Sequence, residues 1–115
     1  MKEKQVLSGT GIDATTAATT RLGYVMVHKY GGSVEVVEAI VRQTKAKDAT
    51  FNIKVGGKEI FSSDKSVAKL GSAEIFIPDQ NKYHAASMLA VDFVVKTSSG
   101  TAGSKFDVSV LFRKL

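Results

Sequence analysis

The two histidines are the side chains whose unperturbed pKa suits acid or base catalysis near neutral pH. His28 and His84 lie far apart in the sequence, on unrelated predicted elements. A catalytic histidine needs a carboxylate that orients it and a partner that reacts, and the sequence gives neither residue such a setting. We therefore interpret His28 as a partly buried or interface residue of a strand and His84 as a loop residue. The sequence predicts a protein that is not an enzyme.

Ligand-binding motifs are equally weak in this sequence. Gly9-Thr10-Gly11 has the small residues of a phosphate-binding loop. It lacks the preceding strand, the following helix and the further glycines or lysine that such a loop needs. The aspartates occur singly, without the spacing of a calcium-binding loop, and the chain contains no cysteine for thiolate metal sites or thiol catalysis. We expect no cofactor and no metal ion.

A net charge of +5 raises the question of an anionic partner such as nucleic acid or a membrane surface. The lysines are scattered along the chain, next to turns or on the polar sides of predicted strands, with acidic residues between them. This distribution is typical of solvated strand faces and protected sheet edges. No stretch approaches the roughly 18 apolar residues of a membrane-spanning helix. We expect neither nucleic acid nor a membrane as a partner.

Alternation of apolar and polar residues is the strongest pattern in the chain, and it is typical of strands with one buried face. Gly56-Gly57 predicts a tight hairpin turn that places Ile60 opposite Ile53. Within the predicted strand 33–43, the apolar residues shift by one position from one alternating set to the other. This shift predicts a bulge near Val36 and Val37. Residues 79–86 are predicted to be a polar connection with one helical turn. Strands are predicted at residues 22–29, 33–43, 49–55, 58–61, 73–77, 88–97 and 105–113.

These elements predict an all-β fold, an antiparallel β-sandwich that is jelly-roll-like and has about seven to eight strands. The length of the chain, 115 residues, fits one small domain. We divide the chain into an extended N-terminal arm, residues 1–20, and a β-sandwich domain, residues 21–115.

The arm differs in composition from the rest of the chain, because it is small, polar and aperiodic. Only Val6, Leu7 and Ile12 in it could bury much area. Alone, such a segment would not offset the entropy lost on ordering. Three alternatives are open: a disordered tail, an arm that orders on a neighbouring subunit, and a lead-in strand of the same domain.

The order of features from Val37 to the carboxyl end resembles a group of viral proteins. The features are the strand Val37-Glu-Ala-Ile-Val41, the hairpin from Ala49 to Phe61 with its Gly-Gly turn, Leu70-Gly71, the strand 89–95, and the loop 100–103 before the strand 106–112. Together they cover about two-thirds of the chain. They resemble the small β-sandwich proteins of tailed bacteriophage virions, which include head decoration (cement) proteins and tail or baseplate modules.

The resemblance implies a non-enzymatic structural protein that decorates and stabilises a capsid lattice. It would be made in the host cytoplasm and displayed in many copies on the capsid exterior, often as trimers, with the major capsid protein and neighbouring copies of itself as partners. The first 30 residues lie outside the resemblance. The alternative is a tail or baseplate module that binds a receptor or a carbohydrate, with residues 79–86 and 98–104 as recognition tips. Protein contacts are predicted at Val6, Leu7, Ile12, Arg21, Tyr24 and Tyr30.

Overall fold

The computed structural model describes residues 4–14, 18–27, 32–45, 49–97 and 104–115. In this part of the chain nothing helical is long and apolar enough to span a membrane. The described residues form nine strands: β1 (Lys4–Ala14), β2 (Ala18–Met26), β3 (Gly32–Lys45), β4 (Thr50–Val55), β5 (Lys58–Glu59), β6 (Glu74–Phe76), β7 (Lys82–Ala85), β8 (Met88–Thr97) and β9 (Ser104–Lys114).

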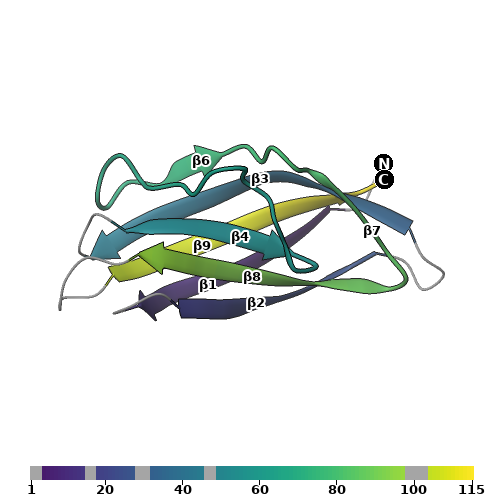
Figure 1. Cartoon of the computed structure of the whole chain (residues 1–115), viewed down its shortest axis with the longest axis horizontal. Coiled ribbons are helices and arrows are strands. Elements are labelled where there is room, and N and C mark those ends of the chain that lie inside the picture. The colour runs from purple at the N-terminus through teal and green to yellow at the C-terminus, as the bar shows by residue number, and fades with distance from the viewer. Residues whose placement is uncertain (1–3, 15–17, 28–31, 46–48, 98–103) are drawn as a thin grey trace.

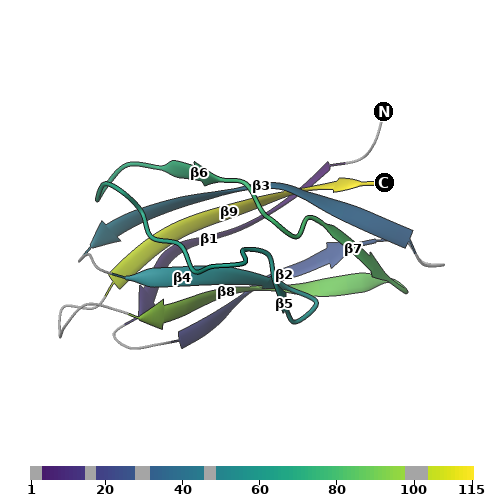
Figure 2. The ribbon, with the colours of Figure 1, turned by 45° about the horizontal axis from the view of Figure 1, so that its top comes forward.

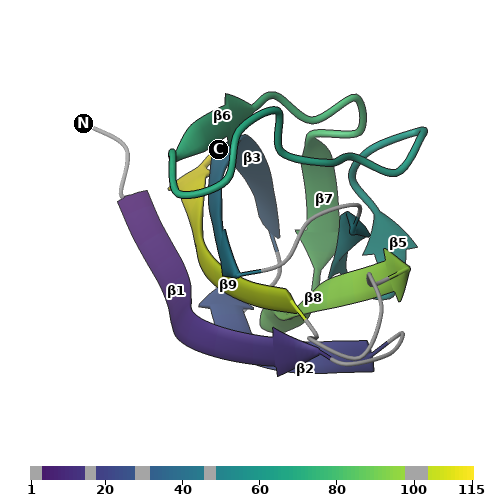
Figure 3. The same ribbon diagram turned by 90° about the vertical axis from the view of Figure 1, so that its left-hand side faces the viewer.

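The strands form two antiparallel sheets that pack face to face. Sheet A has the order β1-β9-β3-β6. β6 and β7 both pair with the edge of β3 that faces away from β9, β6 at residues 39–41 and β7 at residues 32–35. Sheet B has the order β2-β8-β4-β5. Figure 1 shows the strands running along the long axis, and Figure 3 looks along that axis and shows β1, β9 and β3 curving around one side. The prediction of an antiparallel sandwich is confirmed, with nine described strands instead of seven or eight.

The core lies between the sheets and consists of the apolar half of each alternating strand. Phe51 is at its centre, with its ring centroid 5.3 Å from that of Phe76, 5.4 Å from Phe93 and 6.0 Å from Phe106. These four rings come from both sheets, and all of them are buried. Aromatic rings at such separations attract each other beyond the effect of buried area. The alternating segments predicted from the sequence therefore supply the contacts between the layers.

The hairpin between β4 and β5 follows the prediction. Gly56 and Gly57 have φ angles of 60° and 81°, and two consecutive positive φ angles are the mark of a type I′ turn. The amide of Ile60 donates to the carbonyl of Ile53 at 2.9 Å. At Gly56 an added Cβ would lie 2.7 Å from the side chain of Leu89, whereas at Gly57 it would meet open space.

The predicted bulge in β3 is also confirmed. The pairing of β3 with β9 shifts between Val36 and Glu38. Val34 and Val36 are buried before the shift, and Ala39 and Val41 are buried after it. One extra residue therefore keeps both halves of the strand on the core.

Residues 4–14 and 18–20, the described part of the predicted arm, are strand residues of the sandwich. β1 pairs with β9 from Lys4 opposite Arg113 to Ala14 opposite Ser104. This is the lead-in strand among the three alternatives. The segment has few apolar residues, but the edge of β9 supplies backbone partners that its composition does not reveal. Contacts of these residues with a neighbouring subunit stay a prediction.

A side-chain amide joins the edges of the two sheets where β1 and β2 lie next to each other. The Gln5 amide nitrogen donates to the carbonyl of Met26 at 2.7 Å, and its oxygen accepts from the amide of Met26 at 3.1 Å. The Gln5 side chain therefore takes the place of a paired residue at the edge of sheet B. Such pairing satisfies backbone groups that an open edge leaves exposed.

The connection from β5 to β8 runs from sheet B to sheet A and back, as Figure 2 shows. It covers the edge of β4, where the amides and carbonyls of Phe51 and Lys65 exchange two hydrogen bonds of 2.8 Å. The helical turn predicted within residues 79–86 is wrong, since β7 occupies this region and pairs with Gly32–Glu35 of β3. The reason is tertiary: Tyr83 is buried opposite Val34, so the polar segment is anchored as a strand.

Candidate interaction surface

The outer face of sheet B brings two predicted contact residues together. Arg21 lies opposite Asp92 in the β2–β8 pairing and forms an ion pair with it. The guanidinium also donates to the hydroxyl of Tyr24 at 2.6 Å and lies 5.1 Å from the centre of its ring. The hydrogen bond that Arg21 donates to the Asp92 carboxylate raises the pKa of Arg21. The arginine therefore keeps its positive charge and fixes the position of the tyrosine.

Next to this pair lies a small group of exposed apolar side chains, which we call the sheet B patch: Tyr24, Met26 and Met88. Their side chains are 51%, 46% and 46% exposed. Met26 is opposite Met88, and Tyr24 is opposite Ala90. Methionine and tyrosine are frequent in protein interfaces because they offer large contact areas. A bulge between Arg21 and Gly23 turns this end of β2 so that these side chains face outward.

The other predicted contact residues do not join the sheet B patch. Val6 is on the outer face of sheet A and is 59% exposed. Leu7 packs against the core, and Ile12 is buried in it. Their sequence signal, isolated apolar residues in a polar segment, is the same for all three. Only the register of β1 against β9 separates them. Tyr30 lies outside the described residues.

The outer face of sheet A carries a larger group of apolar side chains that sequence reasoning missed. We call it the sheet A band. Ile75 and Ile77 are 59% and 66% exposed, and Ile40 and Leu111 are half-buried. Val6 pairs with Leu111, and Ile40 pairs with Ile75. Between these pairs Leu111 lies opposite Glu38, and Ile40 lies opposite Ser109, so Leu111 and Ile40 are diagonal neighbours on β9 and β3. The sequence signal is Leu111, an apolar residue on the otherwise polar side of its strand. The band consists of Val6, Ile40, Ile75, Ile77 and Leu111.

Two ion pairs border the sheet A band, one on each side along the strands. Arg113 on β9 pairs with Glu35 on β3. Beyond the other side, Arg42 on β3 donates to Asp107 on β9 at 2.7 Å. The amide of Gly11 donates to Asp107 at 2.9 Å, and this bond together with Arg42 lowers the pKa of Asp107. The Asp107 carboxylate is therefore ionised at neutral pH.

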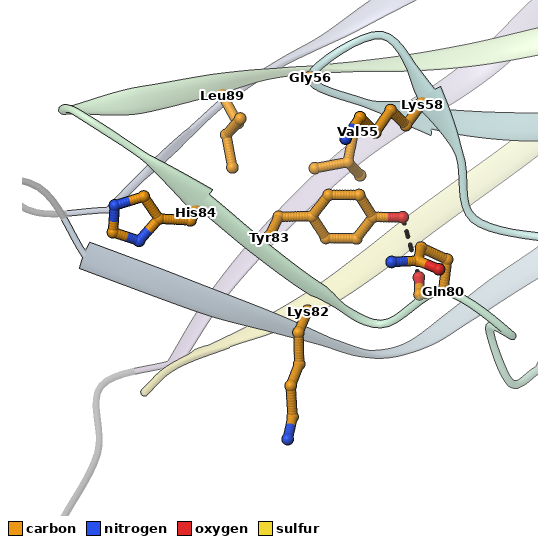
Figure 4. Close-up of a pocket in the computed structure, with 8 residues that line it drawn as sticks. All are labelled: Val55, Gly56, Lys58, Gln80, Lys82, Tyr83, His84 and Leu89. Carbon is orange, nitrogen blue, oxygen red and sulfur yellow. Dashed lines mark hydrogen bonds between the residues drawn. The ribbon is translucent and has the colours of Figure 1, made fainter.

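A hollow of about 210 Å³ lies between the β4–β5 hairpin, β7 and the start of β8 (Figure 4). Its wall is the ring of Tyr83, whose hydroxyl donates to the carbonyl of Gln80 at 2.9 Å. Burial raises the pKa of Tyr83 to about 12, so the hydroxyl is protonated at neutral pH. Lys82 and His84 point away from this ring in different directions (Figure 4). The polar groups of the hollow therefore do not converge on a common point.

Of the two histidines, only His84 lies within the described residues. His84 is on β7 and not in a loop as predicted, and its Nδ1 lies 3.1 Å from the hydroxyl of Ser33 on the neighbouring strand. His28 and most of the predicted recognition tip at residues 98–104 lie outside the described residues. Within the described ranges, no group of three or more histidine or acidic side chains is placed to hold a metal ion.

Comparison of the fold with solved structures finds viral capsid proteins. A structure of infectious bursal disease virus, Gt strain, matches 98% of this chain with a TM-score of 0.55 and 11% identity. The VP2 protein of that virus in T=1 particles matches 98% with a TM-score of 0.55, and its subviral particle matches 96% with a TM-score of 0.51. The chain spans about a third of the length of these capsid proteins.

At 11–12% identity these similarities show a shared fold. No known protein family matches the chain, and no curated protein matches it in sequence. The sequence resemblance implied the β-sandwich of a virion structural protein, and the structural neighbours are β-rich virion proteins. They are not proteins of tailed bacteriophages. The β-sandwich of this chain is therefore an architecture found in viral capsids.

Proposed function

We propose that this protein is a non-enzymatic structural subunit of a virion that decorates the capsid exterior and stabilises the lattice. The observation that supports this most is the match of almost the whole chain, 98%, to a capsid protein of a virus. Most of the exposed large apolar side chains in the described residues lie on the outer faces of the two sheets, where a partner protein can cover them.

The sheet B patch is the surface that we assign to the major capsid protein. Exposed methionine and aromatic side chains next to a fixed arginine have the composition of an interface centre. Arg21 and Tyr24 are already held together by a hydrogen bond and by the contact of the guanidinium with the ring. They therefore lose little side-chain entropy when a partner covers them.

Binding to particles tests the proposal directly. Particles of the virus whose genome encodes the chain are prepared without the protein and then mixed with it, and bound protein is measured after sedimentation. Because β1 belongs to sheet A, deletion of residues 1–20 would damage the fold, and a single substitution is the better probe. Met88→Lys should reduce binding at least tenfold. The control Ser66→Lys adds the same charge at an exposed position outside the sheet B patch and should bind normally.

The copy number in complete particles separates the proposal from the tail or baseplate alternative. Quantitative mass spectrometry of purified virions should find the chain in numbers comparable to the major capsid protein. A few copies per particle, or binding to a glycan or cell surface without affinity for capsids, would support the alternative. Equal binding of Met88→Lys and the unchanged protein would remove the sheet B patch from the proposal.

A further inference from the structure

We infer that the outer face of sheet A binds a second copy of this chain, face to face, about a two-fold axis that lies between the two copies and is parallel to the sheets. The inference goes beyond the proposed function, which leaves the contact between copies unassigned. It does not depend on a virion location, because it is drawn from the sheet A band and the two ion pairs that border it.

The sheet A band is the first observation. Three of its members, Val6, Ile75 and Ile77, are more than half exposed, although strand residues of this size are usually placed on a core. Exposed apolar groups that are contiguous and have a polar border mark contact sites in soluble proteins. A second sheet is the natural cover for such a face, since sheets pack on each other through aligned strands about 10 Å apart.

The charges on the two sides of the band are the second observation, and they identify the partner. On one side the acid, Glu35, is on β3 and the base, Arg113, is on β9. On the other side the base, Arg42, is on β3 and the acid, Asp107, is on β9. The four charges therefore alternate around the corners of a rectangle in the sheet.

This alternation makes the face complementary to itself. A two-fold axis across the strands brings Glu35 of one copy opposite Arg42 of the other, and Arg113 opposite Asp107. An axis along the strands brings Glu35 opposite Arg113, and Arg42 opposite Asp107. Either axis places each acid of the two bordering ion pairs over a base of the other copy, as an interface made by the same patch on both subunits requires. Glu38, which lies opposite Leu111 on this face, takes no part in the pattern. A partner of one sign of charge would meet two repulsive corners.

The charge at the borders of the sheet A band and the area of a broad face of the molecule are both compatible with a second copy of this chain as the partner. The chain carries +5 overall, so two copies repel each other on average, but the two ion pairs at the borders of the band are neutral in sum. The molecule measures 46 × 23 × 22 Å. A broad face therefore offers on the order of 1,000 Å², and a stable interface needs about 800 Å² from each partner. Sheet A is wide enough for the contact without help from other surfaces.

The oligomeric state of the isolated protein tests the inference without any capsid. Light scattering during size-exclusion chromatography should give twice the chain mass of 12.3 kDa. Ile75→Lys should halve this mass, while Met88→Lys, the same change on the sheet B patch, should leave it unchanged. Val6→Lys on the other edge of the band is a second variant, and circular dichroism checks that each variant is folded. A monomeric or trimeric unchanged protein, or a dimer that survives both band substitutions, would overturn the inference.

A single cysteine locates the contact. The chain has no cysteine of its own, so Leu111→Cys introduces one thiol near the centre of the sheet A band, where either two-fold axis brings the two copies close together. A short bis-maleimide linker should convert most of this variant to covalent dimers at low protein concentration. Met88→Cys should not be cross-linked under the same conditions, because its thiol lies away from the proposed contact. Cross-linking of Met88→Cys but not of Leu111→Cys would place the contact on sheet B and refute the inference.

Discussion

Asn52 offers a sharp test of how sheet B holds the segment that crosses to sheet A. This side chain is fully buried. Its amide nitrogen donates to the carbonyl of Phe61 and to the Asp64 carboxylate, both at 3.0 Å. Its oxygen accepts from the amide of Ile53 at 2.8 Å and from that of Phe61 at 3.3 Å. One asparagine therefore satisfies both backbone groups of Phe61 where the chain leaves the hairpin.

We expect Asn52→Ala to lower the free energy of unfolding by roughly 2–6 kcal/mol, because two buried backbone groups of Phe61 lose their partner at about 1–3 kcal/mol each. For a domain of this size, each kcal/mol lowers the melting temperature by about 3–6 °C. Urea denaturation followed by circular dichroism measures the change. The control Asp64→Asn alters an exposed neighbour and keeps an acceptor for the Asn52 amide, so it should change stability by less than about 0.5 kcal/mol.

Asn52→Asp adds a test that depends on pH. The new carboxyl group has almost the shape of the amide, but its ionised form would be buried against the carbonyl of Phe61 and near the charge of Asp64. Burial raises the pKa of such a group in the folded state above its unfolded value of about 3.9. Below that value both states are protonated, and the variant should be close to the parent. As the pH rises toward 7 the unfolded state ionises first, so the variant should lose stability relative to the parent.

Two results would refute this reasoning. A loss of less than about 1 kcal/mol for Asn52→Ala would mean that water replaces the side chain in its bonds to Phe61. A difference between Asn52→Asp and the parent that is the same at pH 3.5 and pH 7 would mean that the site is open to solvent.

Three further substitutions test other parts of the structure. Asp107→Asn removes a carboxylate whose pKa is lowered in the folded state, first by a backbone amide and then by an arginine. We expect it to be less stable than the parent at pH 7, with a difference that shrinks as the pH falls below about 4; a constant difference in paired urea titrations would argue against this. Gly56→Ala should melt at a lower temperature than Gly57→Ala, because both positions have positive φ but only the first new Cβ would clash with a leucine; equal melting temperatures would contradict the contact. Gln5→Leu removes the bridge to the backbone of Met26 and should cost about 1–2 kcal/mol, with faster hydrogen exchange at the Met26 amide; unchanged exchange would show that the edge is protected in another way.

The strands that alternate strictly were predictable because the apolar residues of each strand lie on one face, and that face is the buried one. Phe51, Phe93 and Phe106 come from three such strands, and all three side chains are in the core. The Gly56-Gly57 turn was predictable for a similar reason, since two glycines allow a backbone that few other residues adopt. These features depend on interactions between residues that are close in the sequence or on a repeat that any single strand displays.

β1 and β7 were not predictable in the same way, because their partners are distant in the sequence. β1 contains only three large apolar residues and pairs with β9 at the other end of the chain. β7 is a polar segment that becomes a strand because Tyr83 fills the space opposite Val34. In both cases the neighbouring strand supplies the hydrogen-bond partners, and composition does not record them.

By itself, the amino-acid sequence determined that this protein is a β-sandwich with one alternating core, because a two-residue period requires one buried and one exposed side on each strand. It also identified Arg21 and Tyr24 as candidates for contact. Only the tertiary structure decided which surface each candidate occupies. The sheet A band joins residues from four strands whose spacing in the chain has no pattern, and its bordering charges alternate only after β3 and β9 lie side by side in register. Register is a property of two strands together, and for that reason a single sequence segment does not contain it.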